Sequence, residues 1–152
     1  MPKKIFALVL LLSIFLIQST AMAGGYQRYL NGDRNYILYD GHMGTAWYVV
    51  RGSLRVEADK YPAAVLSIVS AQVNNAYDGA TTVTSQIRLF FVYDRDKREA
   101  VWIKSPDDYL VLKRDASRAG GSAMVKAAEM AYYLATSGEK FFGFSSDFYP
   151  DL

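Results

Sequence analysis

The segment Thr81–Tyr93 alternates apolar and polar side chains and constrains the fold more than any other part of the chain. Its apolar positions are Val83, Ile87, Leu89, Phe91 and Tyr93, with Ser85 as the one interruption, and Thr82, Thr84, Gln86 and Arg88 occupy the other side. A period of two is what a strand with one buried and one wet face requires. The segment therefore predicts a strand in a sheet that is buried on one side only.

Other segments rich in β-branched and aromatic residues predict further strands. They are Tyr36–Tyr39, Thr45–Val50, Ala63–Val73, Glu99–Lys104 and Tyr109–Leu112. Ala63–Val73 fits a helix or a strand, and its alternation favours a strand. Asp40-Gly41 is a turn signal that closes the first strand, and Gly52-Ser53 is expected to break the second, with Ser53–Glu57 as a brief further strand or turn.

One helix is predicted over Ala123–Thr136, with Ser122 as its N-cap and Gly138 as its stop. Its apolar face comprises Met124, Val125, Ala128, Ala131, Tyr132 and Ala135, whereas Lys126, Glu129 and Tyr133 are expected at the edges or outside. The predicted fold class is therefore α+β: an antiparallel β-sheet of about five to seven strands with one C-terminal α-helix packed on it.

The N-terminus has the three parts of a secretory signal peptide. Lys3 and Lys4 precede the apolar run Ile5–Ile17, and the small-residue triplet Ala21-Met22-Ala23 follows. A membrane anchor is the alternative, but a spanning helix needs about 20 apolar residues, and this run is shorter. We expect cleavage after Ala23, a polar lead-in over 24–35, a single globular domain over 36–152, and a periplasmic or secreted location.

Composition narrows the classes of partner. Removing 23 of the 152 residues leaves 129, enough for one core, with fifteen basic and fifteen acidic residues, because two of the 17 Lys and Arg lie in the leader. A neutral domain without a basic stripe does not predict nucleic-acid binding, and contact with the membrane is expected only through the transient signal peptide. The chain has no cysteine, which excludes disulfides, thiol catalysis and Cys-ligated metals.

No residue pattern predicts a catalytic, metal or cofactor site. His42 is the single histidine and is interpreted as an exposed turn residue. Asp94 and Asp96 open like a calcium loop, but the rest of that motif is absent. Asp107 and Asp108 form an acidic pair in a turn, and Arg114 and Arg118 lie close before the glycine pair Gly120-Gly121, where a small anion could bind. Whether the chain is an enzyme stays open, with a non-enzyme favoured.

Aromatic residues make up 14% of the chain, which is unusual for its size. Those in predicted strands are expected in the core, and those near the ends form a possible interaction patch: Tyr26, Tyr29, Phe144, Phe148 and Tyr149. The rings of the C-terminal tail are expected to pack over the sheet edge or against a neighbouring molecule, because leaving them in water is costly.

The middle of the chain resembles the surface-adhesin protein E family of small exported bacterial domains. The resemblance is carried by Trp47-Tyr48-Val49 leading to Ser53-Leu54, and by Phe90-Phe91-Val92-Tyr93-Asp94 followed by Arg98, within Tyr36–Ile103. It implies a non-enzymatic domain that binds host or envelope proteins. Members of that family are lipid-anchored, and this chain lacks the cysteine that such anchoring needs.

Three functions follow as hypotheses. The first is an exported, non-catalytic domain that binds another protein or itself. The second is a small periplasmic hydrolase that uses His42 or the Asp107 and Asp108 region. The third is a carrier of a small apolar ligand, which would need an apolar void under Met124, Ala128 and Tyr132.

Overall fold

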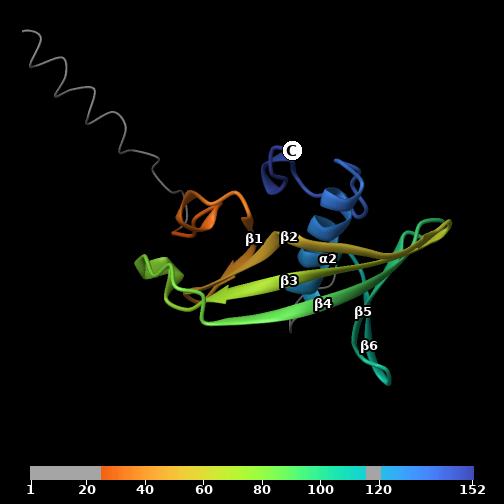
Figure 1. Ribbon diagram of the computed structural model, residues 1–152, viewed down its shortest axis with the longest axis horizontal. Coiled ribbons are helices and arrows are strands. Elements are labelled where there is room, and N and C mark those ends of the chain that lie inside the picture. Colours follow the sequence, from red (N-terminus) through yellow and green to blue (C-terminus); the bar gives the residue numbers. More distant parts are fainter. Residues whose placement is uncertain (1–24, 116–120) are drawn as a thin grey trace, which may run out of the picture.

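The computed structural model describes residues 25–115 and 121–152, and it confirms the predicted α+β class. Figure 1 shows a sheet of six strands with one helix packed on it. The strands are β1 (Tyr36–His42), β2 (Thr45–Lys60), β3 (Ala63–Val73), β4 (Ser85–Asp94), β5 (Glu99–Ser105) and β6 (Asp108–Leu112). The helix α2 (Gly121–Ala135) follows them, and the short 3-10 turns are η1 (Leu30–Gly32), η2 (Ala76–Asp78) and η3 (Ser146–Phe148).

The sheet is a meander in which every strand pairs antiparallel with its neighbour in sequence, in the order β1-β2-β3-β4-β5-β6. It twists strongly, so that β5 and β6 run steeply across the direction of β2 and β3 (Figure 1). Because α2 is the one helix among the described residues, it covers one face of this sheet and leaves most of the other without a helix.

Two apolar clusters lie on opposite faces. The larger lies between the sheet and α2 and contains Ile37, Val49, Ile68, Leu89, Phe91 and Tyr93 from the strands and Val125, Ala128 and Ala131 from the helix. The smaller lies under the lead-in and contains Leu30, Ala46, Tyr48, Val73 and Ala76. The lead-in is attached to the sheet, since the backbone N–H of Leu38 donates to the carbonyl of Arg28 at 2.9 Å.

The prediction that Asp40-Gly41 forms the first turn is wrong. Both residues lie inside β1, and the turn is made by Met43 and Gly44, whose φ angles are 47° and 81°. Gly41 is instead needed for packing, because a Cβ at this position would lie 2.5 Å from the ring of Tyr26. A glycine next to a strand signal can therefore mark a close approach as well as a turn.

The prediction that Gly52-Ser53 breaks the second strand is also wrong, since β2 continues to Lys60. The pairing with β3 shifts register between Val50 and Arg55, as at a β-bulge. The Ser53 hydroxyl donates to the Val50 carbonyl at 2.6 Å and accepts from the Val69 N–H at 2.7 Å. This side chain satisfies the ladder groups that the bulge leaves unpaired, so the strand survives.

The alternating segment is a strand only from Ser85 onward, so the prediction that it begins at Thr81 is wrong by four residues. Leu89, Phe91 and Tyr93 are buried as expected, but Ile87 is 58% exposed on the same side of the strand. The helix covers the first three and does not extend over Ile87, so this end of the helix-facing surface is open.

The helix begins two residues before the predicted start, so Ser122 lies in its first turn and is not the N-cap. Its C-terminus closes where expected: Ser137 adopts φ 56°, and the N–H of Gly138 donates to the Tyr133 carbonyl at 2.9 Å. Within residues 25–115 and 121–152, no helix is long and apolar enough to span a membrane.

Candidate functional site

The residues considered for catalysis lie apart. His42 is exposed at the end of β1, where its backbone pairs with Thr45. Asp107 and Asp108 lie at the turn between β5 and β6, and Asp108 forms an ion pair with Lys104 at 3.3 Å. Because β1 and β6 are the two edges of the sheet, the geometry does not bring these carboxylates to His42. It offers no support for a hydrolase built on these groups.

The loop that begins with Asp94 is a capped turn. The Asp94 carboxylate accepts from the Lys97 backbone N–H at 3.0 Å and pairs with the Lys97 ammonium at 3.2 Å. These bonds hold the pKa of Asp94 below its ordinary value, chiefly through the backbone N–H. The hydroxyl of Tyr61 donates to Asp96. Across the described residues, no group of three His, Asp or Glu side chains is placed to hold a metal ion.

Arg114 lines an open groove of about 350 Å³ together with Lys97, Arg98 and Lys113. The guanidinium of Arg98 lies 5.6 Å from the centre of the Phe141 ring, against one wall. Arg118, the other residue considered for a small anion, lies outside the described residues. Anion binding here stays a prediction.

The predicted aromatic patch divides into two places. The ring centre of Phe148 lies 4.8 Å from that of Phe144 and 5.2 Å from that of Tyr149. Phe144, Phe148 and Tyr29 pack against the larger cluster, between the sheet and α2. Tyr26 belongs to the smaller cluster on the other face, where its ring meets Tyr77 at 5.8 Å and its hydroxyl accepts from the Gly44 N–H at 2.9 Å.

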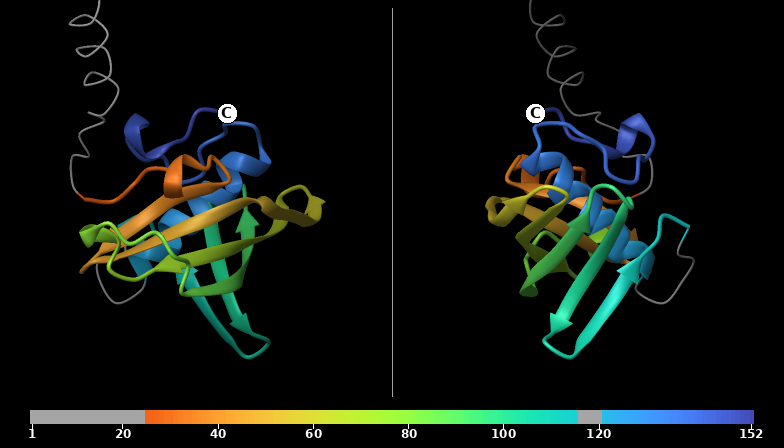
Figure 2. Two further views of the ribbon diagram at one scale, coloured as in Figure 1. Left: turned by 60° about the vertical axis from the view of Figure 1, so that its left-hand side comes forward. Right: turned by 90° about the vertical axis from the view of Figure 1, so that its right-hand side faces the viewer.

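The rings of the tail are partly covered by the chain itself, and Tyr149 is buried. The tail 136–152 lies over α2 and beside the lead-in, as both views in Figure 2 show. We expected the tail to pack over the sheet edge or a neighbouring molecule, whereas within the chain it packs mainly on the helix α2. Four of the five patch residues remain half-buried surface.

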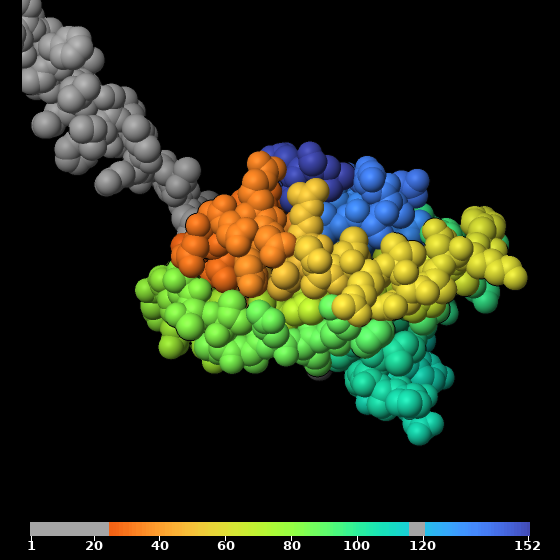
Figure 3. Space-filling view, viewed as in Figure 1, coloured from red at the N-terminus to blue at the C-terminus, as the bar shows by residue number. Residues whose placement is uncertain are grey.

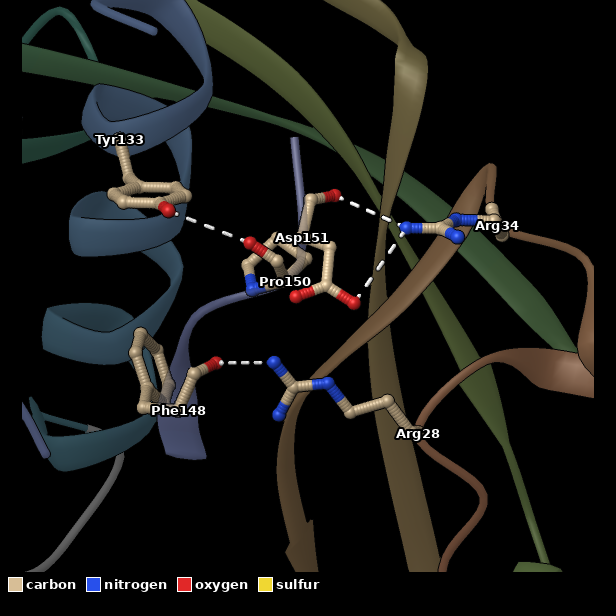
Figure 4. A network of polar contacts seen from close by, with 6 residues as sticks. All are labelled: Arg28, Arg34, Tyr133, Phe148, Pro150 and Asp151. Carbon is tan, nitrogen blue, oxygen red and sulfur yellow. Dashed lines mark hydrogen bonds and ion pairs between the residues drawn. The ribbon is translucent and has the colours of Figure 1, made fainter. Parts of the chain in front are cut away.

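Two arginines of the lead-in attach the tail (Figure 4). The Arg28 guanidinium donates to the backbone carbonyls of Asp147 and Phe148, the latter at 3.1 Å. Arg34 donates to the Asp151 carbonyl at 3.2 Å. A charged donor makes a stronger hydrogen bond to a carbonyl than a neutral donor does. These bonds from the two arginines join the lead-in to the C-terminal tail.

The decisive contact of the tail is with Glu129, which the sequence placed at an edge of the helix and which is fully buried (0% exposed). Its carboxylate accepts hydrogen bonds from three successive backbone N–H groups, those of Phe141, Phe142 and Gly143, at 3.1, 2.5 and 3.3 Å. The Tyr149 hydroxyl donates a fourth bond at 2.5 Å. We call this set of contacts the Glu129 latch.

The electrostatics of the latch follow from burial. Burial first, and then the hydrogen bond to Glu129, raise the pKa of Tyr149 well above its ordinary value. Burial and the Glu129 charge do the same for the pKa of Tyr93, whose hydroxyl donates to the Ala128 carbonyl at 2.8 Å. Both phenols therefore remain protonated donors at neutral pH.

The latch is a structural device. All four partners of Glu129 are donors, so its acceptor capacity is used within the chain. Successive backbone N–H groups that converge on one anion form a nest, which stabilises a charge that burial alone would make very costly. The chemistry of this carboxylate is to hold the tail on the helix.

The sequence contains one signal that could have revealed this role. Glu129 stands between Ala128 and Met130, and an aromatic segment follows within about a dozen residues. A helix with apolar residues on more than one side is buried on more than one side. A segment that covers the second side must then supply hydrogen-bond donors to any carboxylate that it buries. The periodicity of one face alone could not show this.

The fold and these contacts define a small α+β domain whose helix is enclosed between an antiparallel meander and its own C-terminal tail. Comparisons with known proteins gave no matching family model, no matching curated protein and no matching solved structure.

Removing the carboxylate should release the tail. Glu129→Ala leaves four donors without an acceptor, and each buried unsatisfied group costs about 1–3 kcal/mol, so we expect at least about 3 kcal/mol of lost stability in urea unfolding. Tyr149→Phe removes one donor to Glu129 and also the acceptor of the Phe144 N–H, so it should cost about 1–3 kcal/mol. Glu139→Ala, at an exposed glutamate of the same region, is the control and should stay within about 0.5 kcal/mol of the parent. Equal stability of Glu129→Ala and Glu139→Ala would contradict the latch.

Proposed function

We propose that the mature chain is an exported, non-catalytic domain that acts by binding a protein, and that a second copy of the chain is a partner its surface fits. The observation that carries the proposal is the uncovered apolar face of β4, β5 and β6, on the side of the sheet opposite α2. The resemblance to the surface-adhesin protein E family implies the same class of function.

The register of the sheet places the apolar side chains of this open face next to one another. Phe90 pairs with Ile103, which pairs with Tyr109, and all three point away from α2, because their neighbours Phe91 and Trp102 face it. Phe90 is 40% exposed and Tyr109 is 63% exposed. Contiguous exposed apolar side chains in a folded domain mark contact surfaces.

The same surface ends at a free backbone edge. The strand β6 is last in the sheet order, and among the described residues no strand pairs with its outer side. Its first residue, Asp108, is charged and paired with Lys104, and the remaining residues, Tyr109–Leu112, carry no charge. Exposed edges are commonly protected by charged residues or proline, and a run of four uncharged residues along an edge favours pairing with another strand.

A second copy is a partner that this edge fits by symmetry. Two antiparallel β6 strands related by a two-fold axis would continue the sheet from one chain into the next, and each chain would present the same patch. The hairpin of β5 and β6 projects beyond the rest of the described chain (Figure 3).

Export is the part of the proposal that rests on the leader. The intact mass of the chain recovered outside the cytoplasm should correspond to a start at Gly24, after cleavage behind Ala23. An Ala23→Leu variant should be cut poorly, because the peptidase accepts small residues there. Recovery of the chain with Met1 still attached would contradict cleavage.

The binding surface can be tested on that exported chain. Light scattering after size exclusion should show a mass that rises with concentration toward two chains, and Tyr109→Lys should reduce it to one chain by placing a charge on the open face. Met43→Lys is the matched control, since Met43 is 87% exposed at the turn between β1 and β2. A single-chain mass at every concentration, or equal loss in both variants, would overturn self-association.

A further inference from the structure

An apolar cleft opens on the helix-facing side of the sheet, at the beginning of α2. It has a volume of about 170 Å³ and is lined by Met124 from the helix, Trp47 from β2, Trp102 from β5 and Ile87 from β4. Along α2, the cleft ends where the helix packs directly on the sheet. At Ala128 the helix is buried, and the Tyr93 hydroxyl donates to its carbonyl at 2.8 Å. Of the three helix residues under which a void was considered, Met124 lines this cleft.

The described lining of the cleft is uncharged. It contains no Lys, Arg, Asp, Glu or His among its nine described residues. The Tyr39 hydroxyl, at its base, is paired with the Ser70 hydroxyl at 2.8 Å. Burial raises the pKa of Tyr39 to about 12, so this phenol is neutral at physiological pH. A charged ligand would lose its hydration here without gaining a partner of opposite sign.

Apolar and aromatic side chains are exposed in the cleft. Ile87 faces the same side as the buried Leu89 but is 58% exposed, so an apolar side chain stands in the cleft without a cover. Both tryptophans of the chain contribute to the walls. Apolar surface with aromatic rings favours an apolar ligand, and an apolar protein cavity of roughly 150 Å³ is large enough for benzene.

We propose that this cleft binds a small neutral molecule containing one or two aromatic rings. The inference goes beyond protein binding by the open face of β4–β6, because the cleft lies on the opposite side of the sheet. The two sites can therefore fail separately: loss of self-association leaves the cleft intact, and a blocked cleft leaves the open face intact.

The two tryptophans provide the readout, since they are the only ones in the chain and both line the cleft. Benzyl alcohol, a neutral one-ring probe that does not absorb at 295 nm, should shift their emission saturably in the exported chain. Benzoate has nearly the same size but carries a negative charge, and we expect at least tenfold weaker binding. Equal response to both probes, or a response to benzyl alcohol that rises linearly without saturation, would overturn the proposal.

Two neighbouring substitutions separate binding in the cleft from adsorption elsewhere. Ser85 lines the cleft at the exposed start of β4, so Ser85→Phe should fill it and weaken benzyl alcohol binding at least tenfold. Gln86 is also exposed, and as the next residue in the strand it points to the other face, so Gln86→Phe should leave binding unchanged. Thermal unfolding of both variants checks that they fold. Unchanged binding in folded Ser85→Phe would contradict the site.

Discussion

The structure depends on the contact between the Glu129 carboxylate and the backbone of the tail. One side of α2 packs on the sheet, and the other side carries an acid that could not be buried without donors. Phe141, Phe142 and Gly143 supply three N–H groups from consecutive residues, and Tyr149 adds its hydroxyl. The tail thereby becomes the second cover of the helix, and the helix becomes the centre of a layered domain.

The same arrangement explains why the two faces of the sheet differ. Within the described part of the chain, α2 and the tail cover one face of the sheet, and the lead-in covers only one end of the other face. No element of residues 25–115 and 121–152 covers the face formed by β4, β5 and β6, and Phe90 and Tyr109 are exposed there. On the helix side, α2 stops short of Ile87, and the apolar cleft is the space that remains. Both proposed binding surfaces lie where α2 does not cover this long, twisted sheet.

Much of the fold could be predicted from the sequence because its signals are local. Alternation located the core of β4, β-branched runs located the other strands, and Gly138 marked the end of the helix. The misplaced boundaries depend on contacts that local patterns do not encode. Gly41 serves the ring of Tyr26, and Ser53 repairs a bulge through Val69, a residue of the next strand. The role of Glu129 was missed for the same reason, since its donors come from a separate segment.

The candidate sites were less predictable than the fold. The terminal aromatic residues were predicted as one interaction patch, but Tyr26 packs against the smaller cluster on the other face of the sheet, and Tyr149 is buried. Neither the open face nor the cleft could be derived from one strand. Each requires the register between strands, which places Phe90 beside Ile103 and brings Trp47 and Trp102 to one side of the sheet.

Amide hydrogen exchange measures the Glu129 latch most directly. The N–H groups of Phe141, Phe142 and Gly143 are bonded to a buried carboxylate, so they should exchange only when the whole domain unfolds, as slowly as the central amides of β3. The amides of Lys140 and Ser145, in exposed residues on either side, should exchange much faster. If all five exchange at the same fast rate, the tail is not held by Glu129, and the account of the enclosed helix is wrong.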